Sequence, residues 1–199
     1  MATRLVGRSP LLRLPLHLGR ACRTGGTGQL YQEALRPFPR PRPHPLHPLH
    51  LTMQGIGFID DLDDEQVARL EHGIRERLAE LPAPVVTFHR PVVRPEAVYL
   101  PTDPPAPITA VRHAVREVIG HVLGEDDVEL APEHVQGYRL HVSVAYSNAA
   151  QSAEPIAATL AQVEAEPVVV TLHHVGLLEF HRDHRMYQWT HSEQVPIGR

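Results

Sequence analysis

The sequence predicts an α+β protein with an internal duplication. Two short segments, residues 49–53 and 140–144, each hold a histidine and, two positions later, a hydroxyl residue between apolar neighbours. This alternation is typical of a strand with one buried face. The order of a helix, a motif strand, a helix and two further strands also occurs twice along the chain. We therefore expect two lobes that each present one motif to a shared cleft.

The composition is that of a folded protein of modest size. The chain has 199 residues, of which 42% are hydrophobic, and a formal net charge of −4, which suits one substantial core or two small fused lobes. No apolar run approaches the roughly 20 residues needed to span a bilayer, so we expect no membrane partner. Cys22 is the only cysteine, which excludes an internal disulfide and suits a reducing compartment such as the cytoplasm. We expect a monomer.

The N-terminal quarter of the chain has an unusual charge. Residues 1–50 hold eight arginines and only one acid, Glu33, while lysine is absent from the whole chain. A basic arm that helps to hold RNA, a misassigned start of the chain and an organelle transit peptide are three interpretations. Leucines alternate along residues 12–18, and Pro15 interrupts them, which favours an edge strand. We therefore predict that residues 1–29 are a basic segment, either an edge strand or disordered.

Local signals predict the remaining elements. The glycine run at residues 25–28 breaks the chain before a short helix at about 30–35, and six prolines in residues 37–48 impose an extended path. Asp63, with Gln66 three positions later, is typical of a helix cap and predicts a helix over 63–80. Further helices are expected at 108–124 and 155–163, and strands at 49–58, 85–88, 92–93, 97–100, 138–146, 168–180 with an irregularity at Gly176, and 186–190.

These elements predict a single bilobal domain over residues 30–190. Its lobes would cover about 30–105 and 106–190, with strand exchange between them allowed. Residues 191–199 are expected to form a C-terminal tail.

The two motifs, His50-Leu51-Thr52 and His141-Val142-Ser143 with their apolar flanks, resemble those of the two-histidine (2H) phosphoesterase superfamily. Within it they are similar to the 2′-5′ RNA ligase and cyclic nucleotide phosphodiesterase group, and the likeness covers roughly residues 30–190. The resemblance implies a pseudo-twofold fold of two antiparallel sheets with outer helices and a central cleft that holds both HxTx motifs. Ser143 keeps the hydroxyl of the usual threonine. One departure is the first strand, for which only the proline-interrupted residues 12–18 are available.

Two histidines that face each other can carry out phosphodiester chemistry. Because imidazole titrates near neutral pH, one of His50 and His141 can act as general base and the other as general acid, each contributing roughly 100- to 10,000-fold. The sequence leaves open which is which. Thr52 and Ser143 would donate hydrogen bonds to phosphate oxygens, and no metal or cofactor is required. The resemblance implies hydrolysis of 2′,3′-cyclic phosphates, reversible 2′-5′ RNA ligation, or both, on RNA ends or nucleotides.

Strict alternation along a strand adds two substrate-binding candidates. Gln54 would share the face of His50, and Arg139 would share the face of His141. Arg139 could supply positive charge to phosphate, although a surface ion pair explains it equally well. For Gln54 the structural interpretation is favoured.

Three aromatic residues, Tyr146, Tyr187 and Trp189, could stack on a base. For each of them, a place in the core or at its rim is the favoured interpretation.

Two other functions compete with catalysis. A non-catalytic protein of the same fold could bind RNA or nucleotides in the cleft. A metal site is the second rival, because His44, His47 and His50 recur every three residues and His181 and His184 have similar spacing. The prolines around the first cluster deny it a helical face, so we expect no metal.

Overall fold

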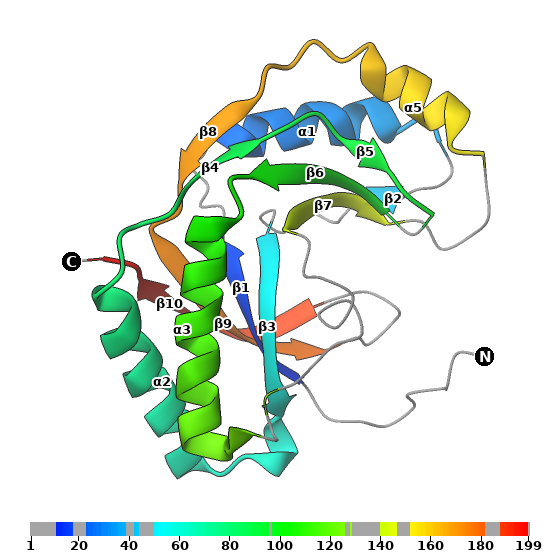
Figure 1. Ribbon diagram of the computed structural model, residues 1–199. Helices are drawn as coiled ribbons and strands as arrows, with labels where there is room; N and C mark the ends of the chain where they lie inside the picture. The colour runs from blue at the N-terminus through cyan, green and yellow to red at the C-terminus, as the bar shows by residue number, and fades with distance from the viewer. Residues whose placement is uncertain are drawn as a thin grey trace.

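The protein is a two-layered α+β structure in which helices cover one side of each of two antiparallel sheets (Figure 1). The structure is a computed structural model that describes residues 11–17, 23–38, 42–43, 50–95, 97–125, 128, 140–146, 152–181 and 188–198. The predicted fold class, with antiparallel sheets and outer helices, is confirmed. None of the helices within these ranges is long and apolar enough to cross a membrane.

The first sheet has four strands in the order β10-β9-β1-β3. They are β1 (Leu11–His17), β3 (His50–Phe58), β9 (His174–His181) and β10 (Gln188–Pro196). Helices α2 (Asp64–Ala79) and α3 (Ala106–Leu123) pack on each other, α2 against β10 and α3 against β3. A short 3-10 turn, Ile59–Asp61, joins β3 to α2.

The second sheet has the order β2-β7-β6-β4-β8, and β5 pairs with β6 beside it. Its strands are β2 (Arg42–Pro43), β4 (Val85–Phe88), β5 (Val92–Val93), β6 (Ala97–Asp103), β7 (His141–Tyr146) and β8 (Val168–Thr171). Helix α1 (Arg23–Leu35) contacts β7, β8 and α5 (Glu154–Ala161), while α5 contacts β5.

The two sheets are interwoven along the chain. Each takes strands from both of the ranges expected to form separate lobes, 30–105 and 106–190. The first sheet combines β3 with β9 and β10, and the second combines β4 and β6 with β7 and β8. Strand exchange is therefore extensive, and neither sheet is a contiguous piece of sequence.

Strand β1 lies inside the first sheet. The alternating leucines form a strand as predicted, but the expected edge position is wrong, because β1 pairs with β3 on one side and β9 on the other. Proline is tolerated inside a sheet where the ladder is interrupted. A register shift of the β1–β3 ladder falls between Leu14 and Pro15, at the position where Pro15 would otherwise disrupt the pairing.

The strongest local signals are confirmed. Helix α2 begins with a capping box in which the Asp63 carboxylate accepts from the Gln66 backbone N–H at 2.7 Å, and the Asp63 N–H donates to the Gln66 side chain at 3.0 Å. Helices α3 and α5 fall where the apolar spacing predicts them. The hairpin of β5 and β6 turns at Arg94, whose N–H donates to the Ala97 carbonyl at 2.9 Å.

Helix α1 is longer than predicted. It begins at Arg23 and includes the glycine run at residues 25–28, which was expected to break the chain. Glycine is only a weak helix breaker when tertiary packing holds the helix, and here Gly28 is buried together with Tyr31 and Leu35. Burial raises the pKa of Tyr31, and the positive charge of Arg90 partly opposes this.

The predicted strand over 168–180 is two strands. The chain leaves β8 of the second sheet after Thr171 and enters β9 of the first sheet at His174. At this crossing the Leu172 N–H donates to the Pro84 carbonyl, and the His173 carbonyl accepts from the Ile197 N–H, both at 2.8 Å. The break therefore lies at residues 172–173, not at Gly176.

The expected C-terminal tail at 191–199 is also wrong over most of its length. Strand β10 continues to Pro196 and pairs with β9 throughout. Val195 and Ile197 are buried in the core.

Deletion of residues 1–17 is expected to abolish cooperative folding. It removes β1 from its place between β3 and β9. The backbone groups of β3 and β9 that pair with β1 would lose their partners, which leaves two open strand edges. Thermal unfolding followed by circular dichroism, together with solubility on expression, measures this, and deletion of residues 1–10 is the control that keeps β1. A soluble fragment of residues 18–199 with a cooperative melt would contradict the interior placement of β1.

Candidate active site

The two motif strands meet between the sheets. His50 is the first residue of β3 and His141 the first residue of β7. Strand β3 contacts β7, and both strands begin near this contact (Figure 1). Two segments far apart in the sequence are thus brought together with their motifs at corresponding ends. The side chains of His50 and Thr52 lie outside the described part of the molecule.

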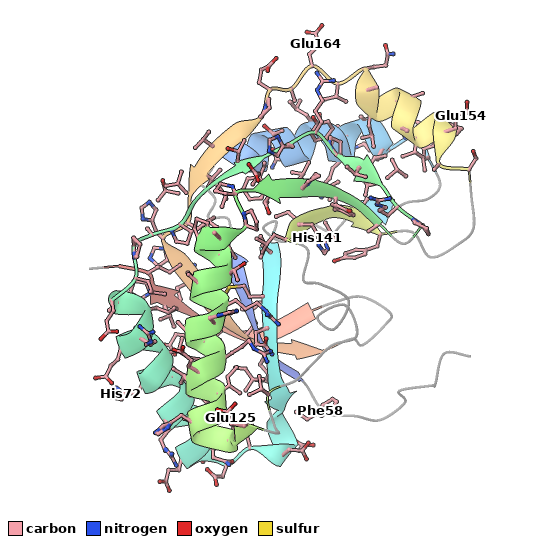
Figure 2. The ribbon with its side chains drawn as sticks, viewed as in Figure 1. Phe58, His72, Glu125, His141, Glu154 and Glu164 are labelled. Atoms are coloured by element: carbon pink, nitrogen blue, oxygen red, sulfur yellow. The ribbon has the colours of Figure 1, made fainter. Side chains whose placement is uncertain are left out.

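Strand β7 shows the alternation that the sequence predicts. His141 is exposed and Ser143 is half-buried, whereas Val142 and Val144 are fully buried on the other face. Figure 2 shows His141 beside β7, on the side away from α1. An apolar face packed under the helix layer therefore holds the polar pair on the open face.

Both motif strands contain one extra residue directly after the hydroxyl residue. In β3, Thr52 pairs with Pro15 and Gln54 with Leu14, so Met53 is skipped. In β7, Ser143 pairs with Tyr99 and Ala145 with Val98, so Val144 is skipped. An extra residue of this kind is a β-bulge, which bends the strand and re-aims the side chains that follow. The two halves therefore share the motif residues and also the β-bulge that follows them in the chain.

Each bulge is held by a side chain from the covering helix. The Arg112 Nε of α3 donates to the Met53 carbonyl at 3.1 Å, and the Gln32 Nε2 of α1 donates to the Val144 carbonyl, also at 3.1 Å. A bulge interrupts the ladder, and a buried carbonyl needs a donor. Each motif strand is covered by the helix that precedes the other motif strand. Helix α1 precedes β3 in the chain but covers β7, whereas α3 precedes β7 but covers β3.

Gln54 does not follow the strict alternation on which its predicted shared face with His50 rests. The extra residue Met53 reverses the alternation, so that the fully buried Gln54 side chain accepts from Arg116 Nη1 of α3 at 3.2 Å. Its amide also donates to the Gly55 carbonyl at 2.9 Å. Gln54 therefore faces the helix layer, and the structural interpretation of this residue fits its surroundings.

The bulge in β7 has the opposite effect on Tyr146. Alternation from His141 would bury Tyr146 beside Val142, but its side chain is 37% exposed. The reversal at Val144 accounts for this exposure.

Tyr99 is a site residue that sequence reasoning missed. Its ring lies against that of His141, with centroids 4.8 Å apart and planes inclined at 49°. The Tyr99 hydroxyl accepts from Arg94 Nε at 3.3 Å. Tyr99 belongs to β6, and only the register of β6 against β7 places it beside the motif.

Several predicted candidates cannot be located. Arg139, Tyr187, His44, His47 and His184 lie outside the described residues, as do the side chains of Trp189 and His181. Within the described ranges, no group of three or more His, Cys, Asp or Glu side chains is arranged to hold a metal ion.

A groove of about 460 Å³ lies elsewhere, between α2 and α3, and none of the motif residues lines it. The two helices approach closely at Gly73, where a Cβ atom would lie 2.9 Å from Val118 Cγ1. The groove is lined by Arg69, His72, Gly73, Glu117, Val118, His121 and Val122.

A duplicated α+β fold that joins two His-x-Thr/Ser strands defines the class of two-lobed, two-histidine phosphoesterases. The model of the 2′-5′ RNA ligase superfamily matches residues 28–184, and the chain belongs to that superfamily. No curated protein matches it.

Solved structures agree with this fold. TT0787 of Thermus thermophilus is 18% identical, with a TM-score of 0.65, over 93% of this chain and 97% of its own. E. coli LigT complexed with NADP+ is 14% identical, with a TM-score of 0.64, over 97% of this chain and 100% of its own. The MHV ns2 PDE domain is 13% identical, with a TM-score of 0.53, over 96% of this chain and 100% of its own. At these identities the likeness shows the fold alone.

Replacement of Arg112 by methionine is expected to lower the free energy of unfolding by about 1–3 kcal/mol, because the buried Met53 carbonyl loses this donor. Chemical denaturation measures the change. Arg77→Met is the matched control, since Arg77 makes exposed ion pairs with Glu80 and Glu117, worth about 0–1 kcal/mol. Equal effects of the two substitutions would show that the Arg112 contact does not support the bulge.

Proposed function

We propose that the protein is a metal-independent phosphoesterase that acts on RNA ends or nucleotides, by hydrolysis of 2′,3′-cyclic phosphates, reversible 2′-5′ ligation, or both. The supporting observation is the contact between β3 and β7, each of which begins with its motif histidine. Membership of the 2′-5′ RNA ligase superfamily agrees with this chemistry. A location in the cytoplasm suits a chain with a single cysteine, and the protein is proposed to act as a monomer.

His50 and His141 are the proposed acid–base pair. For a 2′,3′-cyclic phosphate, one imidazole takes a proton from water as the water oxygen bonds to phosphorus. The bond from phosphorus to the 3′ oxygen breaks, and the other imidazole, as imidazolium, protonates that oxygen and leaves a 2′-phosphate. With a 5′ hydroxyl in place of water, the same two groups would join two RNA ends: the 5′ oxygen gives its proton to the base and bonds to phosphorus, and the 3′ oxygen leaves with the proton of the acid, which forms a 2′-5′ linkage. The reverse of this step cleaves the linkage.

Thr52 and Ser143 are the proposed phosphate ligands. Each lies two positions after its histidine in a strand, and Ser143 is half-buried on the open face of β7. Hydroxyl donors there would stabilise the charge that develops on the non-bridging oxygens. Arg139, two positions before His141, is proposed to add positive charge.

The proposed substrate class is supported by neighbours of the same fold. Structures of E. coli LigT hold ATP, NADP+ and 3′-AMP. A nucleotide bound near β7 in this protein would have the exposed ring of Tyr146 within the same strand as a stacking surface.

His50→Ala and His141→Ala are each expected to lower kcat on 2′,3′-cyclic nucleotides by about 10²- to 10⁴-fold, because each removes one proton-transfer group. Turnover of cyclic nucleotides and of 2′-5′-linked oligonucleotides is measured with and without EDTA, and EDTA should not change it. His72→Ala, on the exposed side of α2, is the control.

Unchanged turnover in both variants would refute the catalytic assignment. No wild-type turnover, together with salt-sensitive affinity for RNA, would instead identify a non-catalytic RNA-binding protein. Stoichiometric metal after tag-free purification, with loss of activity on chelation, would identify a metal site.

Ser143→Ala is expected to lower kcat by about 10²-fold, because it removes one hydroxyl donor to the phosphate. Ser143→Thr, which keeps the hydroxyl, should retain most of the activity. Steady-state kinetics on a 2′,3′-cyclic nucleotide compare the two. If both variants lose activity equally, space at this position matters and the hydroxyl does not.

A further inference from the structure

We infer that Tyr99 is a positioning residue for His141 and that Arg94 holds Tyr99 in place. The inference rests on the proposed function, in which His141 transfers a proton. Neither residue belongs to a motif, and both come from the β5–β6 hairpin, which sequence reasoning connected only with the fold. The contact between the two rings carries the inference.

The Tyr99 ring limits where the His141 imidazole can lie. Its centroid is 4.8 Å from that of His141, at an inclination of 49°, which is within the range of favourable aromatic contacts. His141 is exposed at the start of its strand, so the Tyr99 ring packs against an imidazole that solvent and substrate can reach. Tyr99 is half-buried in the neighbouring strand, so its ring restricts the positions of the imidazole on one side.

Arg94 restrains the far end of the Tyr99 side chain. Its Nε donates to the Tyr99 hydroxyl at 3.3 Å, and its own backbone is fixed by the turn in which its N–H donates to the Ala97 carbonyl. Tyr99 itself lies across from Val92 in the same hairpin. The hairpin therefore holds the ring at both ends, by the strand pairing and by the guanidinium group.

The strand beside the motif differs between the two halves of the molecule. Tyr99 is the cross-strand partner of Ser143 in β7. The corresponding partner of Thr52 in β3 is Pro15 of β1. The backbone around the two motifs is alike, down to the extra residue in each strand, yet the neighbouring strand supplies tyrosine on one side and proline on the other. The cross-strand partner of the hydroxyl residue is therefore one point at which the two motifs differ.

Orientation matters for proton transfer because the imidazole nitrogen must lie within hydrogen-bond reach of the oxygen that it protonates or deprotonates. A misplacement of about 1 Å can cost on the order of 10²-fold in rate. Tyr99 should therefore affect kcat through His141 and leave substrate binding nearly unchanged.

The test compares Tyr99→Leu, Tyr99→Phe and Arg94→Met in steady-state turnover of a 2′,3′-cyclic nucleotide. Tyr99→Leu removes the ring and is expected to lower kcat by about 10- to 100-fold with KM changed less than about threefold. Tyr99→Phe keeps the ring and should restore kcat to within about fivefold of wild type. Val169→Ala is the control, because Val169 is an exposed residue of β8.

Arg94→Met and Tyr99→Phe break the same hydrogen bond. The kcat of the double variant should therefore be no lower than that of either single variant. If Arg94 instead contacts the substrate, Arg94→Met raises KM and its effect adds to that of Tyr99→Phe, which overturns the role given to Arg94. A loss in Tyr99→Leu that appears in KM alone, or a Tyr99→Phe variant as impaired as Tyr99→Leu, overturns the positioning of His141.

Nuclear magnetic resonance of the imidazole C–H protons provides a readout that does not depend on turnover. The ring current of Tyr99 should be lost from the His141 signals in Tyr99→Leu and kept in Tyr99→Phe, and unchanged His141 signals in both would overturn the contact. Absence of turnover in the wild-type protein would overturn the proposed function, and the catalytic role of Tyr99 with it, while the resonance shifts still report the ring contact.

Discussion

The extra residue after the hydroxyl residue of each motif is the constraint on which the site depends. Before it, alternation puts the polar pair of β7 on the open face and its valines under α1. After it, the alternation is reversed, so Gln54 enters the helix layer and Tyr146 emerges. A skipped residue leaves its carbonyl out of the regular ladder, and Arg112 and Gln32 hold the two carbonyls concerned. The side chains therefore change face directly after each motif, and a hydrogen bond from the covering helix stabilises the bulge that causes the change.

The crossed arrangement makes the two halves of the chain depend on each other. Helix α1 lies against β7 and α3 against β3, so each motif strand is covered by the helix that precedes the other motif. The first sheet is likewise assembled from β1 and β3 together with β9 and β10. Neither half can bury its own motif strand alone. The relative position of the two motifs is therefore fixed by the core, and not by a linker between two independent lobes.

Sequence patterns predicted what is local in this protein. The capping box at Asp63 and the apolar spacing of α2 and α3 can be recognised from neighbouring residues alone. The alternation around His141 can be predicted because one face of the strand is buried. The interior position of β1, the crossing at residues 172–173 and the surroundings of Gln54 depend on register and on partners far along the chain. Strict alternation failed at Met53 because this bulge contains no glycine that would mark it in the sequence. Tyr99 was missed because no local pattern reveals which residue of β6 faces the motif.

Duplication alone would create two equivalent histidines, but an acid–base pair needs two groups in opposite protonation states at the start of each turnover. The two motif strands share the polar pair in their sequences, the buried apolar neighbours and the bulge. The residues of the neighbouring strands opposite the hydroxyl positions, Pro15 in β1 and Tyr99 in β6, differ between the two halves. The surroundings of the two motifs can therefore differ through the neighbouring strands, although the motif strands share one pattern.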